Sequence, residues 1–356
     1  MIKNCYIHIP FCNKICSYCD FCKLYYDEKF VNRYLDELEK EIKSIYKGEV
    51  LDTIYIGGGT PSSLNNKQLE RLFEILNLFN KSETVEFTIE SNFENINEEK
   101  LLIYKKNGIN RLSFGLESIN ENNLTFLNRN ITKEKINNTI NSCRSLGFNN
   151  INIDLIYALP VEDISILKND LGYIFSLDIE HISTYSLMIE DHTMLKINSI
   201  ENISEELDYE MYKLICKEMK KNNYYHYEIS NFSKSGYESK HNLCYWNNDN
   251  YYGFGLGASS YIDNKRITNT RSINKYLNGN YRLDIIELSN KDLIEYKIML
   301  NLRNAEGISL EEVKLDVRDL VKEGLLIEEN NRVRIPEEKW YVSNEIILRV
   351  LEDYNE

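Results

Sequence analysis

Four cysteines lie in one short loop near the start of the chain, at Cys12, Cys16, Cys19 and Cys22. Thiols this close together predict a metal centre. A disulfide framework belongs to short secreted domains, whereas this chain has 356 residues and shows no secretory signal. A structural zinc site usually takes its ligands as two separated pairs, so a zinc loop is the rival interpretation. The spacing Cys-x3-Cys-x2-Cys favours an iron–sulfur cubane with three irons held by thiolates and the fourth iron open.

After the cysteine loop, expected strands and helices alternate regularly. Apolar patterns predict strands over residues 5–10, 51–56, 85–91, 110–115, 150–157 and 180–188. Helical spacing predicts helices over residues 28–46, 66–79, 98–106, 121–146, 163–176 and 204–221. This alternation predicts a parallel sheet, because a crossover helix returns the chain to begin each parallel strand. We therefore expect an α/β fold, an open or partial (βα)6 barrel, with its chemistry at the carboxyl ends of the strands.

Unusual residues follow the expected strands at those carboxyl ends. After the second strand comes Gly57-Gly58-Gly59-Thr60, whose glycines allow close backbone approach and leave amide donors for a polar ligand. A tight turn is the simpler interpretation of a glycine run taken alone. The following strands end near Glu90, Glu117 and Asp154. One acid in a strand is usually a solvated rim residue, but acids at successive strand ends predict a shared polar site.

The pattern changes after residue 222, and we predict two domains, 1–222 and 223–356. The second domain opens with aromatic residues and contains His241-Asn242-Leu243-Cys244-Tyr245-Trp246. A glycine-rich loop at 253–258 is expected to pack closely against another segment, and a helix is expected over 289–302. Residues 309–335, with an Asn-Asn turn, and a closing helix over 340–352 predict a small winged-helix-like module. The second domain is therefore expected to be α+β.

Charge and composition limit the partners. The net charge is −14 and the sequence pI is about 5.1, which argues against a nucleic-acid partner, because phosphate binding needs surplus Lys and Arg. Winged helices often bind DNA, but residues 305–338 hold ten acidic and five basic side chains, so a packing role is expected. No apolar run is long enough to span a bilayer. Eight cysteines without a secretory signal predict a reducing cytoplasm.

Taken in order, the cysteine loop, the glycine run, the strand-end acids and His-Asn-x-x-Tyr-Trp resemble the heme chaperone (HemW) family of the radical S-adenosylmethionine superfamily. The resemblance covers nearly the whole chain. It implies that Cys12, Cys16 and Cys19 hold a 4Fe-4S cluster whose open iron binds S-adenosylmethionine. It also implies S-adenosylmethionine contacts from Tyr6, Tyr18, Gly58, Gly59, Thr60, Glu90, Glu117, Arg129 and Asp154. A heme site needs an axial ligand and flat apolar surface, and the candidates for these are His241, Tyr245 and Trp246.

The resemblance implies a protein that binds heme and hands it to an acceptor protein, with an electron donor for its cluster. Whether it is also an enzyme stays open. The alternative is the related oxygen-independent coproporphyrinogen III oxidase (HemN) or another radical enzyme that modifies porphyrins. That oxidase has a fourth cysteine two residues after the third, where this chain has Phe21, and this favours the chaperone. For residues 241–246 the simpler interpretation is a capped turn with a buried tryptophan.

Several positions depart from the family's pattern, among them Cys22, residues 127–131 and Glu117. Cys22 stands where the chaperones usually have no thiol, and we interpret it as a spare cysteine rather than a heme contact or a site of oxidation. Residues 127–131 keep Arg129 but lack the usual glycine and histidine. Glu117 stands where glutamine is expected, so beside a cofactor carboxylate it is expected to be protonated or paired.

Overall fold

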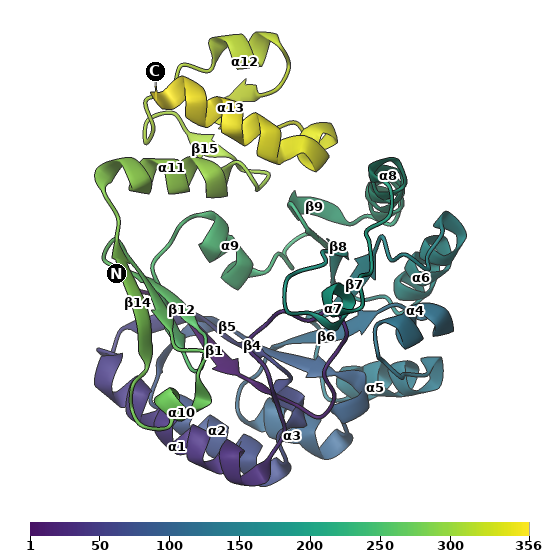
Figure 1. Cartoon of the computed structure of the whole chain (residues 1–356), viewed down its shortest axis with the longest axis vertical. Coiled ribbons are helices and arrows are strands. Elements are labelled where there is room, and N and C mark those ends of the chain that lie inside the picture. Colours follow the sequence, from purple (N-terminus) through teal and green to yellow (C-terminus); the bar gives the residue numbers. More distant parts are fainter. Residues whose placement is uncertain (356) are drawn as a thin grey trace.

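The computed structural model describes residues 1–355, except the side chains of Asp353 and Asn355. The described strands include one large mixed sheet of twelve strands, in the order β14-β13-β12-β11-β1-β4-β5-β6-β7-β8-β10-β9 (Figure 1). Helices lie around its outer side, so the predicted α/β class is confirmed. Among the described helices, none combines the length and the apolar character needed to cross a membrane.

Six neighbouring strands in this sheet run parallel, as the strand–helix alternation predicts. They are β1 (Asn4–Ile9), β4 (Val50–Gly58), β5 (Asn80–Asn92), β6 (Arg111–Glu117), β7 (Ile151–Tyr157) and β8 (His181–Ser186). The helices that follow them are α1 (Glu28–Ile45), α2 (Asn66–Leu76), α3 (Glu98–Lys106), α4 (Glu121–Phe126), α5 (Lys133–Ser145), α6 (Ile164–Ser176), α7 (Met194–Ile197) and α8 (Glu205–Lys221). The helices expected over 121–146 are α4 and α5, and the chain breaks between them where Asn128 adopts a positive φ of 58°.

Short polar side chains determine where the crossover helices begin. At each of these positions the side-chain oxygen accepts a hydrogen bond from a backbone N–H of the first turn, which would otherwise lack a partner. Asn65 and Gln68 form a reciprocal capping box at α2. The other capping residues are Asp27, Asn97, Asn120, Thr132, Asp163 and Ser204. Each strand-to-helix loop therefore ends at a defined residue. This fixes the position of the strand end that precedes the loop.

Strand β6 shows how the sheet separates a core face from a cavity face. Leu112, Phe114 and Leu116 belong to the main hydrophobic core. The alternate residues line a cavity instead, and they are Arg111, Ser113, Gly115 and Glu117. Successive side chains of a strand point to opposite faces, so this period of two puts a polar surface on the inside of the partial barrel.

Residues beyond 222 add strands to both edges of this sheet. On one side β11 (Tyr251–Phe254) pairs in parallel with β1, followed by the antiparallel strands β12 (Ser259–Ile262), β13 (Lys265–Asn269) and β14 (Arg282–Glu287). On the other side β10 (Asn231–Ser233) pairs with β8, and β9 (Tyr225–Glu228) pairs with β10. The short helix α10 (Ile273–Tyr276) lies between β13 and β14. The predicted boundary between residues 222 and 223 stays a prediction, and the segments on its two sides share one sheet.

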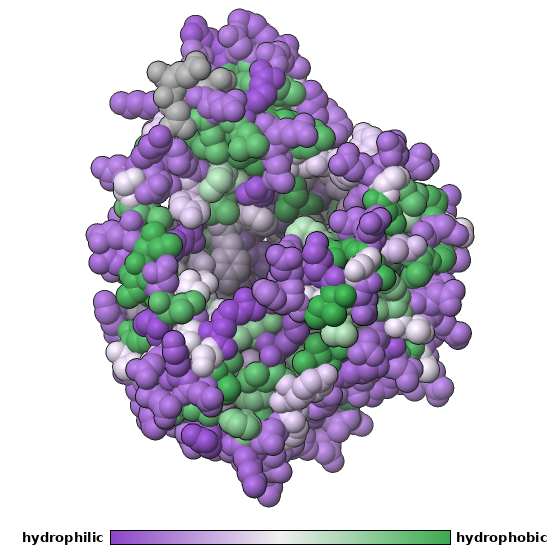
Figure 2. All heavy atoms as spheres, viewed as in Figure 1, coloured by the Kyte–Doolittle hydropathy of each residue, from purple (hydrophilic) through white to green (hydrophobic). Residues whose placement is uncertain are grey.

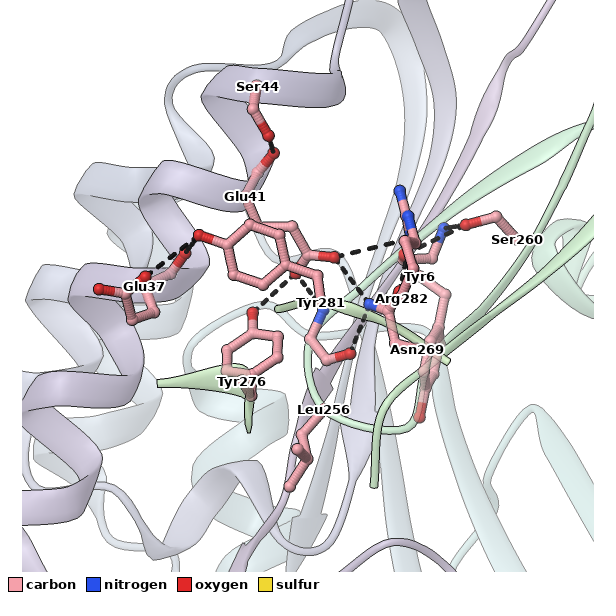
Figure 3. A network of polar contacts seen from close by, with 12 residues as sticks. Tyr6, Glu37, Glu41, Ser44, Leu256, Ser260, Asn269, Tyr276, Tyr281 and Arg282 are labelled. Carbon is pink, nitrogen blue, oxygen red and sulfur yellow. Dashed lines mark hydrogen bonds and ion pairs between the residues drawn. The ribbon is translucent and has the colours of Figure 1, made fainter. Parts of the chain in front are cut away.

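A buried carboxylate on α1 contacts the edge of the sheet that β11 to β14 form (Figure 3). Glu41 accepts hydrogen bonds from Gly255 N at 2.8 Å, from the Tyr276 hydroxyl at 2.7 Å and from Asn269 Nδ2 at 2.7 Å. Arg282 Nη1 lies 3.8 Å from its Oε1 atom. Burial raises the pKa of Glu41, and these donors oppose that rise. The donors come from both sides of β12 and from β14, so one helix secures the whole added edge of the sheet.

The chain ends in a small module with a hydrophobic core of its own. Its elements are α11 (Asn290–Asn301), β15 (Ile308–Ser309), α12 (Arg318–Lys322), β16 (Ile327–Glu329), β17 (Arg332–Arg334), the 3-10 segment Glu337–Val342 and α13 (Ser343–Asn355). The three strands pair antiparallel, and Asn330 and Asn331 both have a positive φ in the turn between β16 and β17, as a tight hairpin requires. Helix, hairpin and closing helix thus follow the predicted order.

Candidate functional site

A cavity of about 500 Å³ lies among the carboxyl ends of the parallel strands and the cysteine loop. Figure 2 shows the face seen in Figure 1 hollowed near its centre. All the residues that the sequence assigned to the cluster and to S-adenosylmethionine line this cavity, with the exception of Tyr6: they are Cys12, Cys16, Tyr18, Cys19, Gly58, Gly59, Thr60, Glu90, Glu117, Arg129 and Asp154. The fold therefore brings together residues that are up to 142 positions apart, from Cys12 to Asp154.

Cys12 ends the short strand β2 (Phe11–Cys12), and Cys16 and Cys19 lie in the loop between β2 and its parallel partner β3 (Leu24–Tyr25). Burial raises the pKa of all three thiols, that of Cys16 to about 11. Nearby cations oppose the rise, Arg129 at Cys16 and Lys23 at Cys12 and Cys19. A coordinating thiol is deprotonated by the metal, and these cations would stabilise the thiolates that result.

A cluster and a single zinc ion need different arrangements of the thiols. Structural zinc needs its ligands gathered around one atom. In a cubane each thiolate binds its own iron, so the sulfurs lie farther apart. Among the side chains that the structure describes, no group of three or more His, Cys, Asp or Glu is placed to hold one ion. The metal content of the protein distinguishes the two interpretations.

Glu90 at the end of β5 supports the glycine turn after β4. Its Oε2 accepts a hydrogen bond from Gly58 N at 3.0 Å, and its Oε1 accepts one from the Tyr55 hydroxyl at 2.9 Å. Burial, with the neighbouring Asp154 carboxylate, raises the pKa of Glu90 to about 7. Glu90 thus sets the backbone of the glycine turn and can change charge near neutral pH.

Glu117 is paired, as its position beside the predicted cofactor site requires. The Tyr18 hydroxyl donates to Oε1 at 2.9 Å, and Arg129 Nη1 lies 2.9 Å from Oε2. Arg129 also binds Glu94 through two hydrogen bonds of 3.0 Å. Burial raises the pKa of Glu117 to about 7, and the Arg129 guanidinium opposes that rise. Glu117 has a φ of 62°, a backbone conformation that costs energy in a residue with a side chain and that is common at functional sites.

Gly58 occupies a position where any side chain would clash with His8 and strain the backbone. Its φ is 120°, and a Cβ atom built there would lie 2.8 Å from His8 Nδ1 and Cε1. We expect Gly58→Ala to lower the free energy of unfolding by about 1–3 kcal/mol, because both the backbone strain and the clash act in the folded state. Chemical denaturation of the two proteins measures the difference.

The matched control for this variant is Gly172→Ala in α6, where an added Cβ would meet no atom within 4 Å. Because alanine is the better helix former, this control is expected to keep or slightly raise stability. Equal stability of the Gly58→Ala variant and the parent would mean that the turn relaxes without cost.

The predicted heme residues lie on α9 (Lys240–Trp246), and His241 is buried there with both ring nitrogens engaged. The Thr53 hydroxyl donates to Asn4 Oδ1 at 3.0 Å, so it accepts from His241 Nδ1–H at 2.7 Å. The Nε2 lone pair is then left to accept from the Tyr245 hydroxyl at 2.8 Å. Burial, with the Arg111 charge, lowers the pKa of His241 to about 3. The imidazole is therefore neutral, the form that binds metals.

Helix α9 is anchored to the barrel from several sides. The Glu86 carboxylate on β5 accepts hydrogen bonds from Lys240 N and His241 N, both at 3.0 Å. At the other end, Asn301 Nδ2 donates to the Trp246 carbonyl at 2.7 Å. Ser239 caps the helix, so the capped turn expected as the simpler interpretation is present, whereas Trp246 is only half-buried. Of the six residues from 241 to 246, Asn242 lines the cavity.

Of the residues predicted around the cofactor, Tyr6 lies outside the cavity lining, and so does the extra thiol of Cys22. The Tyr6 hydroxyl is hydrogen-bonded to His8 Nδ1 at 3.0 Å, and its ring stacks at 6.1 Å between centroids on its register partner Tyr55, which lines the cavity. Cys22 lies against the glycine loop: a Cβ atom added to Gly257 would be 2.7 Å from the Cβ atom of Cys22. This contact confirms that the loop at 253–258 packs closely against another segment.

The sequence prediction missed cavity residues at inward strand positions, and these are Tyr55, Arg111, Ser113, Asn152, Ser183 and Tyr185. The signal was the strand period itself. Counting back in steps of two from Glu117 gives Gly115, Ser113 and Arg111, and counting back from Gly57 gives Tyr55. Extending the strand-end acids along their own strands would have found these side chains.

The comparisons with known proteins agree with this geometry. The sequence profile of the Radical SAM superfamily matches residues 6–173. The heme chaperone HemW of Bacillus subtilis (strain 168) is 36% identical over 371 positions, covering 97% of this chain and 98% of that protein. The heme chaperone HemW of Lactococcus lactis subsp. lactis (strain IL1403) is 35% identical, covering 99% and 98%.

The fold also matches a solved structure, that of coproporphyrinogen III oxidase (HemN) from Escherichia coli. The TM-score is 0.86 with 22% sequence identity, over 99% of this chain and 90% of that one. At this identity the match shows a shared fold. Because two relatives more than 30% identical align with it along nearly its whole length, the chain belongs to the HemW family of the radical SAM superfamily.

Proposed function

We propose that this protein is a heme chaperone that binds heme and passes it to an acceptor protein. The proposal includes a 4Fe-4S cluster on Cys12, Cys16 and Cys19, with S-adenosylmethionine beside it. The full-length relatives that are named heme chaperones support it. The observation that carries it is the cavity of about 500 Å³. In this cavity the cysteine loop faces the polar strand ends, and α9 contributes Asn242, the residue next to His241.

The residues of the cavity suit both parts of the cofactor. Three thiols from one loop would hold the cluster, and Lys23 and Arg129 would offset the thiolate charge. When bound, the cluster would supply an electron and an open iron for the amino and carboxylate groups of S-adenosylmethionine, so the proposal requires an electron donor. Gly58, held by Glu90, lets the backbone approach the ligand closely, and the Tyr18 ring is fixed by its bond to Glu117.

His241 is the proposed axial ligand for heme iron. Its Nε2 lone pair accepts a hydrogen bond from the Tyr245 hydroxyl, so iron would replace that hydroxyl as the partner of Nε2. Thr53 keeps the proton on Nδ1, which sets the tautomer that binding through Nε2 needs. Tyr245 and Trp246 would supply aromatic surface beside the porphyrin.

The cellular setting follows from the same chemistry. All eight cysteines are free, which suits a reducing compartment, and we place the protein in the cytoplasm. The acidic surface argues against nucleic acid as a partner, as the net charge of −14 indicates. The proposed partner is instead an acceptor protein that takes heme from this chain.

An anaerobic heme titration of the reconstituted protein tests the proposal. We expect saturable binding at about one heme per chain, because the proposal contains one heme site, at His241. Turnover of coproporphyrinogen under reducing conditions is the matched assay on the same preparation. No saturable heme binding, or conversion of coproporphyrinogen to protoporphyrinogen, would contradict the chaperone function and favour a porphyrin-modifying enzyme.

A further inference from the structure

The inward end of β6 places an unpaired guanidinium in the wall of the cavity. Arg111 is 1% exposed, yet it lines the cavity, and its Nε atom is buried without a hydrogen-bond partner. Among the side chains that the structure describes, no carboxylate forms an ion pair with it. Its register partner on β5, Thr88, also has a buried hydroxyl without a partner. Two polar groups side by side are therefore left without hydrogen bonds.

An unpaired arginine at this depth is costly. The guanidinium stays charged at any physiological pH, and buried charges in proteins are normally paired and hydrogen-bonded. Burial raises the pKa of two neighbouring carboxyls, those of Glu90 and Asp154, and the charge of Arg111 opposes that rise, but both have other donors. Glu90 accepts from Tyr55 and Gly58, and Asp154 Oδ1 accepts from Asn152 Nδ2 at 2.8 Å. Neither carboxylate forms an ion pair with Arg111, so its guanidinium is left to bind a carboxylate from a ligand.

The surroundings of Arg111 indicate what kind of anion would suit it. Tyr55 and Tyr185 line the same cavity, so the charge lies beside aromatic surface. Tyr55 stacks on His241 with 5.1 Å between ring centroids and 23° between ring planes. Asn242, the residue after His241, is also in the cavity wall. A cation beside flat aromatic surface and near an axial-ligand candidate suits a planar ligand that carries a carboxylate.

We propose that Arg111 binds a propionate carboxylate of heme through a charge-assisted, two-point hydrogen bond. The inference rests on the proposed function. Heme has flat apolar rings and two propionates. His241 is buried outside the cavity lining, but its chain neighbour Asn242 lies in that lining, so a heme whose iron reached His241 would bring its propionates towards the cavity. The guanidinium fork matches a carboxylate in two parallel hydrogen bonds, and this pairing gives orientation as well as affinity. Arg111 would therefore fix which edge of the porphyrin enters the cavity.

The test compares heme with heme dimethyl ester, in which both propionates are blocked. Anaerobic titrations use the reconstituted full chain and its Arg111→Met and Arg111→Lys variants. We expect the parent to prefer heme to the ester by roughly tenfold or more, the size of one charged hydrogen bond. Arg111→Met should lose that preference, and Arg111→Lys should keep part of it, because lysine retains the charge without the fork.

Controls separate this inference from folding and from the other carboxylate that could enter the cavity. Arg144→Met removes an arginine that pairs with Glu180 outside the cavity, and it should leave the preference for heme unchanged. S-adenosylmethionine is titrated in parallel. Weaker binding of S-adenosylmethionine with unchanged heme preference in Arg111→Met would assign the carboxylate to that cofactor and overturn the proposal.

The remaining outcomes distinguish this inference from the proposed function. If the parent binds heme but does not distinguish it from the ester, Arg111 has another role and the chaperone function stands. If the parent binds no heme, both fail together. The comparison of the two ligands on the parent needs no variant, so it can overturn the inference even where Arg111→Met does not fold, and Arg111→Lys then tests whether the preference depends on Arg111.

Discussion

Cys16→Ser is expected to abolish the iron–sulfur absorbance of anaerobically reconstituted protein and to leave the fold largely intact. Removing one of three protein ligands leaves two irons without a thiolate, and serine is a poor replacement for a thiolate ligand. The loop has supports that do not involve the Cys16 thiol. Ser17 N donates to the Leu127 carbonyl at 3.2 Å, and the Ser17 hydroxyl donates to the Phe126 carbonyl at 2.8 Å.

Absorbance, iron and acid-labile sulfide content measure the cluster, and far-UV circular dichroism measures the fold. Cys22→Ser is the matched control, because Cys22 lies in the same loop but packs against Gly257 outside the cavity. It should keep a normal cluster. A normal cluster in Cys16→Ser, or a lost one in Cys22→Ser, would show that the ligand set is different. Zinc without iron or sulfide in the parent would establish the zinc loop instead.

His241→Ala is expected to weaken heme binding by roughly 100-fold or more, because an axial bond and the ordered α9 contacts are lost together. The Soret absorbance during an anaerobic titration follows the change. His241 is buried between Thr53 and Tyr245, so alanine also removes packing. A variant that changes only the partner of Nε2 is therefore needed beside it.

Tyr245→Phe supplies that comparison. It keeps the aromatic ring and removes the hydroxyl that occupies the Nε2 lone pair. If iron binds Nε2, heme affinity in this variant should equal or exceed that of the parent, because no hydrogen bond has to be broken first. An equally large loss in Tyr245→Phe and His241→Ala would instead mean that the pair holds α9 in place and that neither is the ligand.

Most of the fold could be predicted from the sequence, because its signals are local. The crossover helices carry caps such as Asn65 and Asp163 in front of apolar repeats, and the strands read as short apolar runs. Helices were expected over 121–146, and the structure has two there, separated at Asn128, which has a positive φ. The sequence pattern did not locate that break, because a single asparagine in a helical pattern carries a weak signal.

The candidate site could be predicted where chemistry concentrates at strand ends. The thiols, the glycine run and the acids all lie at carboxyl ends of parallel strands, and such ends meet by topology. Tyr6 was assigned to the cofactor by resemblance, and this role stays a prediction: Tyr6 does not line the cavity, whereas Tyr55, its register partner on the next strand, does. Which residues of two paired strands reach a cavity depends on sheet curvature, which no local pattern records.

By itself, the sequence determined the α/β class, the cysteine loop and the pairing that Glu117 needs. Only the tertiary structure decided which partners those residues have. His241 meets Thr53 across 188 positions of sequence, and Glu86 meets the start of α9 across 155. Local patterns reflect burial and backbone preference over a few residues, whereas these contacts depend on how β4, β5 and α9 pack together. The unpaired charge of Arg111 is likewise visible only when every carboxylate around it has been placed.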